Sequence, residues 1–254
     1  MKILQVTDPH LYGSAGARLR GVQTDASLRI VLEAALARSS DYTAVLVTGD
    51  VVQDDTDGYL RFRSMFGSSR APVLCIPGNH DEPEAMRREL DVAPFRFCGA
   101  HRFGAWNFFM LNSYELNCVG GRLGDAELER LDTALAATPD HALVCLHHHP
   151  VPMGSRWLDT SGLADAAEFW RVNETHASVR AVVWGHVHQA YDGRRGAVRL
   201  FATPSTGAQF LPGSDRYAVD SRPPAYRTFE LHDDGRIETK VHWIDSSSIE
   251  LAAG

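Results

Sequence analysis

The sequence has few cysteines, and their spacing gives no sign of thiol chemistry. None of Cys75, Cys98, Cys118 and Cys145 forms a Cys-x-x-Cys pair, and two of the four lie inside apolar runs. Such cysteines are typical of buried free thiols in a reducing compartment. We therefore expect neither a disulfide framework nor an iron–sulfur cluster.

The sequence also lacks an excess of basic residues. It has 25 lysines and arginines against 32 aspartates and glutamates, which gives a net charge of -7 and a pI near 5.9. A protein whose main role is to bind nucleic acid needs a basic face, and no basic segment here is interleaved with aromatic residues. The composition argues against a nucleic-acid partner and against a DNA nuclease.

Long apolar runs and linkers are missing as well. No run is long enough to span a bilayer, and Met1–Leu4 leads directly into a strand-like segment instead of a charged and then apolar leader. No Pro/Ser/Gly linker or charge run divides the 254 residues. We therefore expect a single domain over residues 1–254, in the cytoplasm, with no membrane partner; the oligomeric state is left open.

What the chain does have is a regular alternation of apolar runs and amphipathic segments. The predicted strands are 2–7, 42–48, 73–76, 103–111, 142–146, 179–184, 198–202, 226–231 and 237–243. The predicted helices are 28–36 after an Asp25 N-cap, 58–69, a segment reaching Leu135 after an Asp125 N-cap, and 164–174. The Pro-rich stretch 212–224 is expected to be a loop without regular structure. This alternation predicts an α/β fold with largely parallel strands.

Five of the predicted strands end in residues that can bind metals or move protons. These segments are Asp8-Pro9-His10, Gly49-Asp50, Pro77-Gly78-Asn79-His80-Asp81, His147-His148-His149 and Gly185-His186-Val187-His188. Open α/β sheets bind ligands at the carboxyl ends of their strands, so we expect these segments to meet. Asp54, Asp55 and Asp57 are expected to form a solvated turn.

The chemistry of these donors indicates a pair of metal ions. Carboxylate, imidazole and amide oxygen without thiolate suit Mn²⁺, Fe, Zn²⁺ or Co²⁺. Seven donors exceed what one such ion takes from protein, whereas two ions about 3.5–4 Å apart, sharing a carboxylate and a water, account for them. Asp8, Asp50 and a bridging hydroxide do not neutralise two divalent ions, so the site stays cationic and favours an anion such as a phosphate ester.

Residue spacing leaves one ligand undecided. In an extended chain His147 and His149 share one side and His148 points away, so either His147 or His148 can be the ligand. Five other histidines have no comparable context and are expected to be surface or structural residues: His101, His141, His176, His232 and His242.

In their order along the chain, the five segments resemble the motif blocks of the calcineurin-like metallophosphoesterases. Over nearly its whole length the chain is also similar to the bacterial class III cyclic-nucleotide phosphodiesterases. The residues that carry this second resemblance lie at 146–152, 157–159, 202–206, 209–210 and 227–232. The resemblance implies a four-layer α/β/β/α sandwich, in which two mixed β-sheets are flanked by helices.

The resemblance also implies roles for the site residues. Asp8, His10 and His188 would bind one metal, Asn79, His147 and His186 the other, and Asp50 both; iron and manganese are the expected metals, with zinc or cobalt as alternatives. His80 would protonate the leaving oxygen. The family pattern selects His147 as the ligand and leaves His148 and His149 to support the ligands or contact substrate. The expected substrate contacts are His10, Asp50, Asn79, His80, His147, His148 and His188.

The expected function is hydrolysis of 3',5'-cyclic AMP, and of other cyclic nucleotides, to the 5'-monophosphate by a metal-bound hydroxide. The alternative is a glycerophosphodiester or broad-specificity phosphodiesterase, which would use the same metal ligands. An inactive metal-binding scaffold is disfavoured because His80 and all seven donors are present. Two departures from the family leave these donors intact: Pro9 replaces a small polar residue, and Asn112-Ser113 replaces Asp-Ser.

Overall fold

The computed structural model describes residues 1–67 and 69–245. Residue 68, inside the expected helix 58–69, and residues 246–254, inside the expected domain 1–254, lie outside the described part. The described chain forms two six-stranded sheets. The first has the order β16 (Ile237–Trp243), β15 (Ala225–Leu231), β1 (Lys2–Val6), β4 (Ala44–Thr48), β5 (Val73–Ile76), β6 (Phe95–Phe97). The second has the order β11 (Tyr191–Arg195), β12 (Val198–Ala202), β10 (Val179–Trp184), β9 (His141–Cys145), β8 (Trp106–Met110), β7 (Gly99–Phe103).

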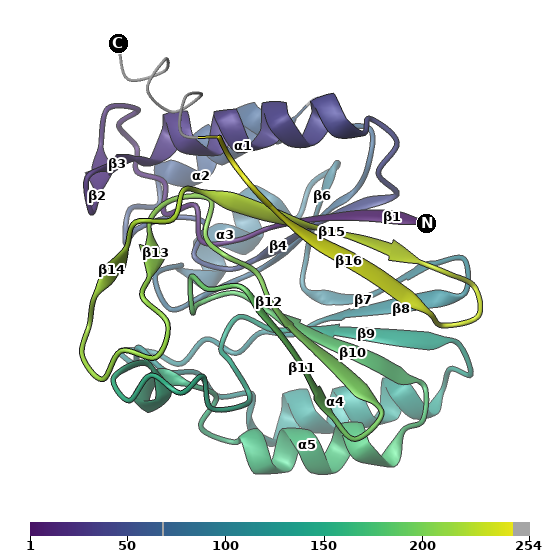
Figure 1. Cartoon of the computed structure of the whole chain (residues 1–254). Helices are drawn as coiled ribbons and strands as arrows, with labels where there is room; N and C mark the ends of the chain where they lie inside the picture. Colours follow the sequence, from purple (N-terminus) through teal and green to yellow (C-terminus); the bar gives the residue numbers. More distant parts are fainter. Residues whose placement is uncertain (68, 246–254) are drawn as a thin grey trace.

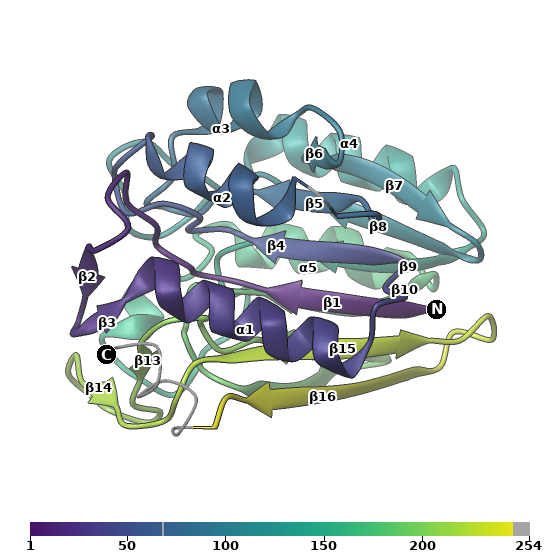
Figure 2. The ribbon, with the colours of Figure 1, turned by 90° about the horizontal axis from the view of Figure 1, so that it is seen from above.

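The two sheets lie face to face between two layers of helices (Figures 1 and 2). The helices are α1 (Thr24–Arg38), α2 (Gly58–Phe66) and α3 (Pro83–Leu90) over the first sheet, and α4 (Gly124–Ala136) and α5 (Ala166–Thr175) over the second. Because central strands such as β4 and β5 are covered on both faces, they appear in the sequence as apolar runs. In β1, Ile3 packs between the sheets, whereas Leu4 and Val6 pack against the helices. The predicted four-layer sandwich is confirmed.

Within each sheet the central strands are parallel and the outer strands make it mixed. β1, β4, β5 and β6 run parallel in the first sheet, and β8, β9, β10 and β12 do so in the second. The other strands, β15 with β16 in one sheet and β7 and β11 in the other, pair antiparallel. Consequently the carboxyl ends of β1, β4, β5, β9 and β10 meet at one edge of the sandwich, and all five donor segments follow these strands.

Two predicted helix caps are wrong, and tertiary contacts explain both. The helix α1 begins at Thr24 after Gln23, and the carboxylate of Asp25 instead pairs with Arg29 at 2.9 Å. The helix α4 begins at Gly124, not after Asp125. Its first N–H groups donate to the carboxylate of Asp165, 41 residues away from Gly124, a partner that no local sequence pattern reveals.

Several predicted segments differ in extent from the strands and loops of the structure. The single strand expected at 103–111 is a hairpin of β7 and β8, because Gly104, at φ 55°, lets the chain reverse between Phe103 and Trp106. The stretch 212–224 is not wholly irregular, since β14 (Val219–Asp220) pairs with β13 (Gln209–Phe210). The helix α3, the strand β6 and the small pair β2 (Arg18–Leu19) and β3 (Val22–Gln23) were not predicted. No helix among the described residues has both the length and the apolar character needed to cross a bilayer.

Candidate metal centre

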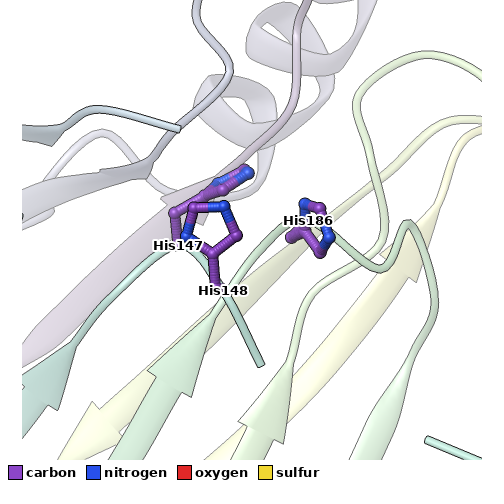
Figure 3. Close-up of side chains that lie close together, drawn as sticks. All are labelled: His147, His148 and His186. Atoms are coloured by element: carbon purple, nitrogen blue, oxygen red, sulfur yellow. The ribbon is translucent and has the colours of Figure 1, made fainter. Parts of the chain in front are cut away.

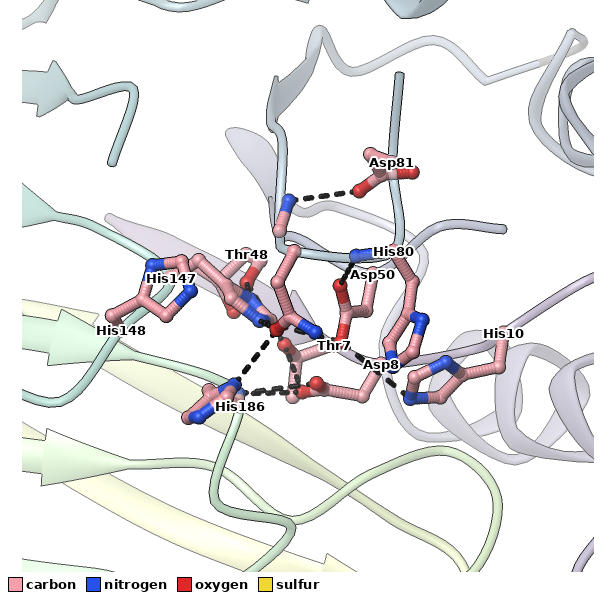
Figure 4. A network of polar contacts seen from close by, with 12 residues as sticks. Thr7, Asp8, His10, Thr48, Asp50, His80, Asp81, His147, His148 and His186 are labelled. Carbon is pink, nitrogen blue, oxygen red and sulfur yellow. Dashed lines mark hydrogen bonds and ion pairs between the residues drawn. The ribbon is translucent and has the colours of Figure 1, made fainter. Parts of the chain in front are cut away.

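The structure brings all seven predicted donors and His80 together at the carboxyl edge of the two sheets. Figure 4 shows most of them, namely Asp8, His10, Asp50, His80, His147 and His186. Four overlapping groups have ligand atoms within 4.8 Å of one another: Asp8, His10 and His188; His10, Asp50 and His80; Asp8, Asp50 and His147; and His147, His148 and His186. Asn79 joins the last group through its amide oxygen. The first sheet supplies Asp8, His10, Asp50, Asn79 and His80, and the second supplies the remaining histidines.

The backbone of these loops is unusual. Asp8, His10, Asp50, His186 and His188 all have positive φ angles, between 47° and 66°. Asp and His adopt this left-handed conformation more readily than most residues, yet it remains unfavourable relative to extended or right-handed backbone. Such strain gathers at functional sites, where the surrounding structure holds it in place.

Two glycines make the close packing possible. A Cβ atom at Gly49, whose φ is 95°, would lie 2.2 Å from Nδ1 of His147. A Cβ atom at Gly78 would lie 2.2 Å from Oδ1 of Asp50. The Gly-Asp and Gly-Asn-His motifs therefore need glycine because the next ligand loop passes directly against their backbone.

The first half of the site contains Asp8, His10 and His188. His188 Nε2 lies 3.3 Å from Asp8 Oδ1 and 3.1 Å from His10 Nε2. His188 Nδ1 lies 2.7 Å from the carbonyl of Ala208, so it carries the proton and donates, which leaves Nε2 without one. A bare ring nitrogen then faces a carboxylate oxygen. Either a proton or a metal cation has to lie between them.

The second half contains Asn79, His147 and His186. His186 Nε2 lies 3.1 Å from Oγ of Ser161, which itself donates to the carbonyl of Leu158 at 2.8 Å. Ser161 Oγ therefore accepts a hydrogen bond from the Nε2–H group, and His186 Nδ1 carries no proton where it lies 3.0 Å from the amide oxygen of Asn79. This second contact between two acceptors also calls for a cation.

His147 and Asp50 lie between the two halves. His147 Nδ1 donates to the carbonyl of Thr48 at 2.7 Å, and its Nε2 lies 3.4 Å from Asp50 Oδ2 and 3.3 Å from Asn79 Oδ1. Asp50 Oδ2 is also 3.8 Å from His10 Nε2. Asp50 thus faces donors of both halves, as a shared ligand would.

The triple histidine is arranged differently from the extended chain assumed in the spacing argument. The chain bends at His147 and His148, so all three rings surround His186. Figure 3 shows His147 and His148 on one side of His186. His148 Nδ1 lies 2.8 Å from Ser113 Oγ, and the His149 ring stacks on that of His186 with centroids 5.6 Å apart.

The electrostatics show how strongly the buried carboxylates attract positive charge. Burial favours a raised pKa for Asp8 and Asp50, yet the neighbouring His188 and His147 reverse this, and both pKa values are lowered. Burial likewise opposes a proton on His147, but Asp50 raises its pKa to about 9. Without a metal, a proton on His147 therefore supplies the positive charge that Asp50 attracts.

Four other imidazoles are held neutral by burial. Burial lowers the pKa of His10 to about 3 and that of His149 to about 4, and it places the pKa values of His148 and His186 well below the usual value. Metals bind neutral imidazole, so these rings are ready to act as ligands or neutral contacts. The donor types, the two acceptor–acceptor contacts and this charge pattern all fit a pair of divalent metal ions.

His80 has partners that the sequence did not reveal. Its Nδ1 lies 3.1 Å from Asp54 Oδ2 and 2.7 Å from Nε2 of Gln53. The nitrogen can accept from the amide when the ring is neutral and donate to Asp54 when the ring is protonated. The expectation that Asp54 belongs only to a solvated turn is therefore incomplete. The one sequence feature that could have indicated this contact is the position of Asp54, four residues after the predicted ligand Asp50.

Asp81 connects the loops that carry Asp50 and His80. Its carboxylate accepts from the backbone N–H groups of Val51, Val52 and Gly78, at 3.1, 3.2 and 2.9 Å, and from the hydroxyl of Tyr59 at 2.9 Å. Burial, with a contribution from Asp50, raises the pKa of Asp81 to about 7. The last residue of the Gly-Asn-His-Asp motif thus fixes the loops and lies behind the donors.

Comparison with known proteins agrees with this geometry. The family model for calcineurin-like phosphoesterases matches residues 1–190. The 3',5'-cyclic adenosine monophosphate phosphodiesterase CpdA of Pseudomonas aeruginosa is 38% identical over 98% of this chain and 92% of its own. The protein of the same name from Escherichia coli K12 is 37% identical over 95% and 89%. The 3',5'-cyclic-nucleotide phosphodiesterase alr5338 of Nostoc is 32% identical over 97% and 94%.

Solved structures show the same fold at low sequence identity. A dimetal phosphatase from Danio rerio superposes with a TM-score of 0.65 at 14% identity, covering 96% of this chain and 99% of that one. A purple acid phosphatase from yellow lupin seeds gives 0.61 at 14% identity, covering 98% and 55%. The match to the family model and the identity to the bacterial relatives show that the chain belongs to the calcineurin-like phosphoesterases.

Proposed function

We propose that this protein is a dinuclear-metal phosphodiesterase that hydrolyses 3',5'-cyclic AMP, and other cyclic nucleotides, to the 5'-monophosphate. The observation that carries the proposal is the convergence of seven donors in two sets that both face Asp50, with His80 beside them. Support for the substrate comes from relatives named as cyclic AMP or cyclic-nucleotide phosphodiesterases, which align with nearly the whole chain.

In this proposal Asp8, His10 and His188 hold one metal and Asn79, His147 and His186 the other, with Asp50 as the shared ligand. Two bound divalent ions supply the positive charge that binds the phosphate and the acidity that activates an attacking water. We propose iron and manganese as the native pair, with zinc or cobalt as alternatives, because nitrogen and oxygen donors suit all four.

His80 serves as the acid that protonates the leaving oxygen. Asp54 and Gln53 hold its Nδ1, which leaves the other ring nitrogen for proton transfer. We propose His10, Asp50, Asn79, His147, His148 and His188 as further contacts of the substrate phosphate. Burial lowers the pKa of His148 well below the usual value, so its ring is neutral. In this role it donates a hydrogen bond to the substrate phosphate instead of binding a metal.

Steady-state kinetics on one preparation with defined metal content test the substrate class. We expect the highest kcat/KM with cyclic AMP, smaller values with cyclic GMP and 2',3'-cyclic AMP, and the lowest with glycerophosphocholine. A kcat/KM for glycerophosphocholine about a hundredfold above that for cyclic AMP corresponds to about 2.7 kcal/mol in transition-state binding. That result would replace the proposal with the glycerophosphodiesterase alternative. Absence of turnover on every diester would favour an inactive scaffold.

The contact between Ser161 and His186 gives a prediction about metal affinity. Ser161→Ala removes the acceptor of the Nε2 proton, so His186 loses its fixed tautomer, and metal affinity should fall about 10- to 100-fold. Metal per chain, measured after dialysis against buffered free metal, reports this without activity. Ser155→Ala is the matched control, because that buried hydroxyl has no partner among the described residues. Equal metal loss in both variants would contradict the role of Ser161.

A further inference from the structure

A hollow of about 460 Å³ opens beside His80. Three loops form it: the one after β4, the one after β5 and the one after β8. Its lining includes Asn79 and His80 on one side and Tyr114, Asn117 and Val119 on the other. Because it shares Asn79 and His80 with the site, the hollow borders the candidate metal centre on the side of the proposed acid.

A second hollow, of about 580 Å³, lies on the other side of the loop after β8. Its lining includes Trp157 and Ser161, and it shares Cys118 and Val119 with the first hollow. Ser161 contacts His186, so this hollow borders the centre at the end away from His80. A diester with two separate alcohols has room for one on each side.

A cyclic nucleotide needs only one of these hollows. In an in-line displacement the attacking water and the leaving oxygen lie on opposite sides of phosphorus. The leaving oxygen must face the acid that protonates it, His80 in the proposed function. Both ester oxygens of a 3',5'-cyclic diester belong to one ribose, so the ribose and the base follow the leaving oxygen to the side of His80.

We propose that the hollow beside His80 is the nucleoside subsite and that the base stacks on the ring of Tyr114. This inference rests on the proposed function. Tyr114 is half-buried and is the aromatic side chain among the lining residues apart from His80. Aromatic side chains stack on any base, because every base has a π-face. The subsite therefore binds adenine and guanine with little discrimination by stacking.

The charge of the lining limits what else can enter. Asp54, Asp55, Asp81 and Glu82 border the hollow, and no lysine or arginine does. Carboxylates and the Asn117 amide accept hydrogen bonds from the ribose hydroxyl or from an amino group of a base. A second phosphate on the nucleoside would meet negative charge without a cation. The subsite consequently suits a nucleoside whose only anionic group is the phosphate at the metals.

The test combines a change in the protein with a change in the substrate. The substrates are cyclic AMP and its abasic analogue, 1-deoxyribofuranose 3,5-cyclic phosphate, and the variants are Tyr114→Ala and Tyr114→Phe. We expect Tyr114→Ala to lower kcat/KM for cyclic AMP about tenfold and to leave that for the abasic analogue within about twofold. Tyr114→Phe keeps the ring and should stay close to the wild-type protein on both.

Leu116→Ala is the matched control, because Leu116 is exposed on the same loop and lies outside both linings. An equal loss on both substrates in Tyr114→Ala, or no loss on cyclic AMP, would overturn the subsite while leaving the proposed function in place. If the wild-type protein itself did not hydrolyse cyclic AMP, the proposed function would fail, and the subsite with it.

Discussion

Asp50→Asn is expected to lower metal content and to reduce kcat/KM for cyclic AMP about 10³-fold. The substitution nearly keeps the shape of the side chain but removes the negative charge that faces His10 and His147. A thousandfold loss of kcat/KM corresponds to about 4 kcal/mol of transition-state stabilisation. Because Asp50 faces donors of both halves, we expect both metal positions to weaken.

Metal per chain and turnover should be measured together on the same Asp50→Asn preparation. Asp25→Asn provides a matched control, since Asp25 is also a buried carboxylate in an ion pair but belongs to the helix α1. That variant should keep its metals. Two metals per chain and near-normal turnover in Asp50→Asn would rule out the shared ligand.

His80→Ala is expected to separate proton transfer from metal binding. The variant should keep its metals and lose about 10²- to 10⁴-fold in rate on cyclic AMP, whose leaving group is a ribose hydroxyl that needs a proton. The loss should shrink for bis-p-nitrophenyl phosphate, because p-nitrophenolate leaves without one. The ratio of the two losses measures the acid role, independently of the amount of active protein.

A histidine outside the site controls for general effects of the His80 substitution. His176 Nε2 lies 2.6 Å from Asp132, so it is also a histidine beside a carboxylate, but at the outer surface. His176→Ala should leave both activities unchanged. Equal losses on the two substrates in His80→Ala would contradict the acid role, and loss of metal would make His80 a ligand or a support for one.

The sequence pattern was sufficient to predict most of the central strands and the donors that the structure brings together, whereas the four layers were expected from the family resemblance. Strands such as β4 and β10 are buried on both faces, so they appear as uninterrupted apolar runs, and the donors come directly after them. The ends of the helices were harder to predict from the sequence. The cap of α4 is the carboxylate of Asp165, so it depends on the packing of a distant segment. Local cap residues such as Asp125 were therefore misleading.

The supporting residues of the site could not be predicted for the same reason. Ser161 is 25 residues from His186, and Asp54 is 26 residues from His80. Neither pair has a spacing that a helix or strand would place on one face. The donors themselves could be predicted because each is tied to the end of its own strand, whereas a hydrogen-bond partner can come from any loop that happens to pass nearby.

The division of donors between the two sheets gives the metals a second role. Each proposed metal position takes ligands from both sheets, Asp8 and His10 with His188 in one case, and Asn79 with His147 and His186 in the other. Bound as proposed, the two ions act as cross-links that tie the halves of the sandwich together at one edge, as a disulfide ties two strands. Chelation would then remove a cross-link between the two sheets as well as a cofactor. The two sheets would separate first at the edge where the substrate binds.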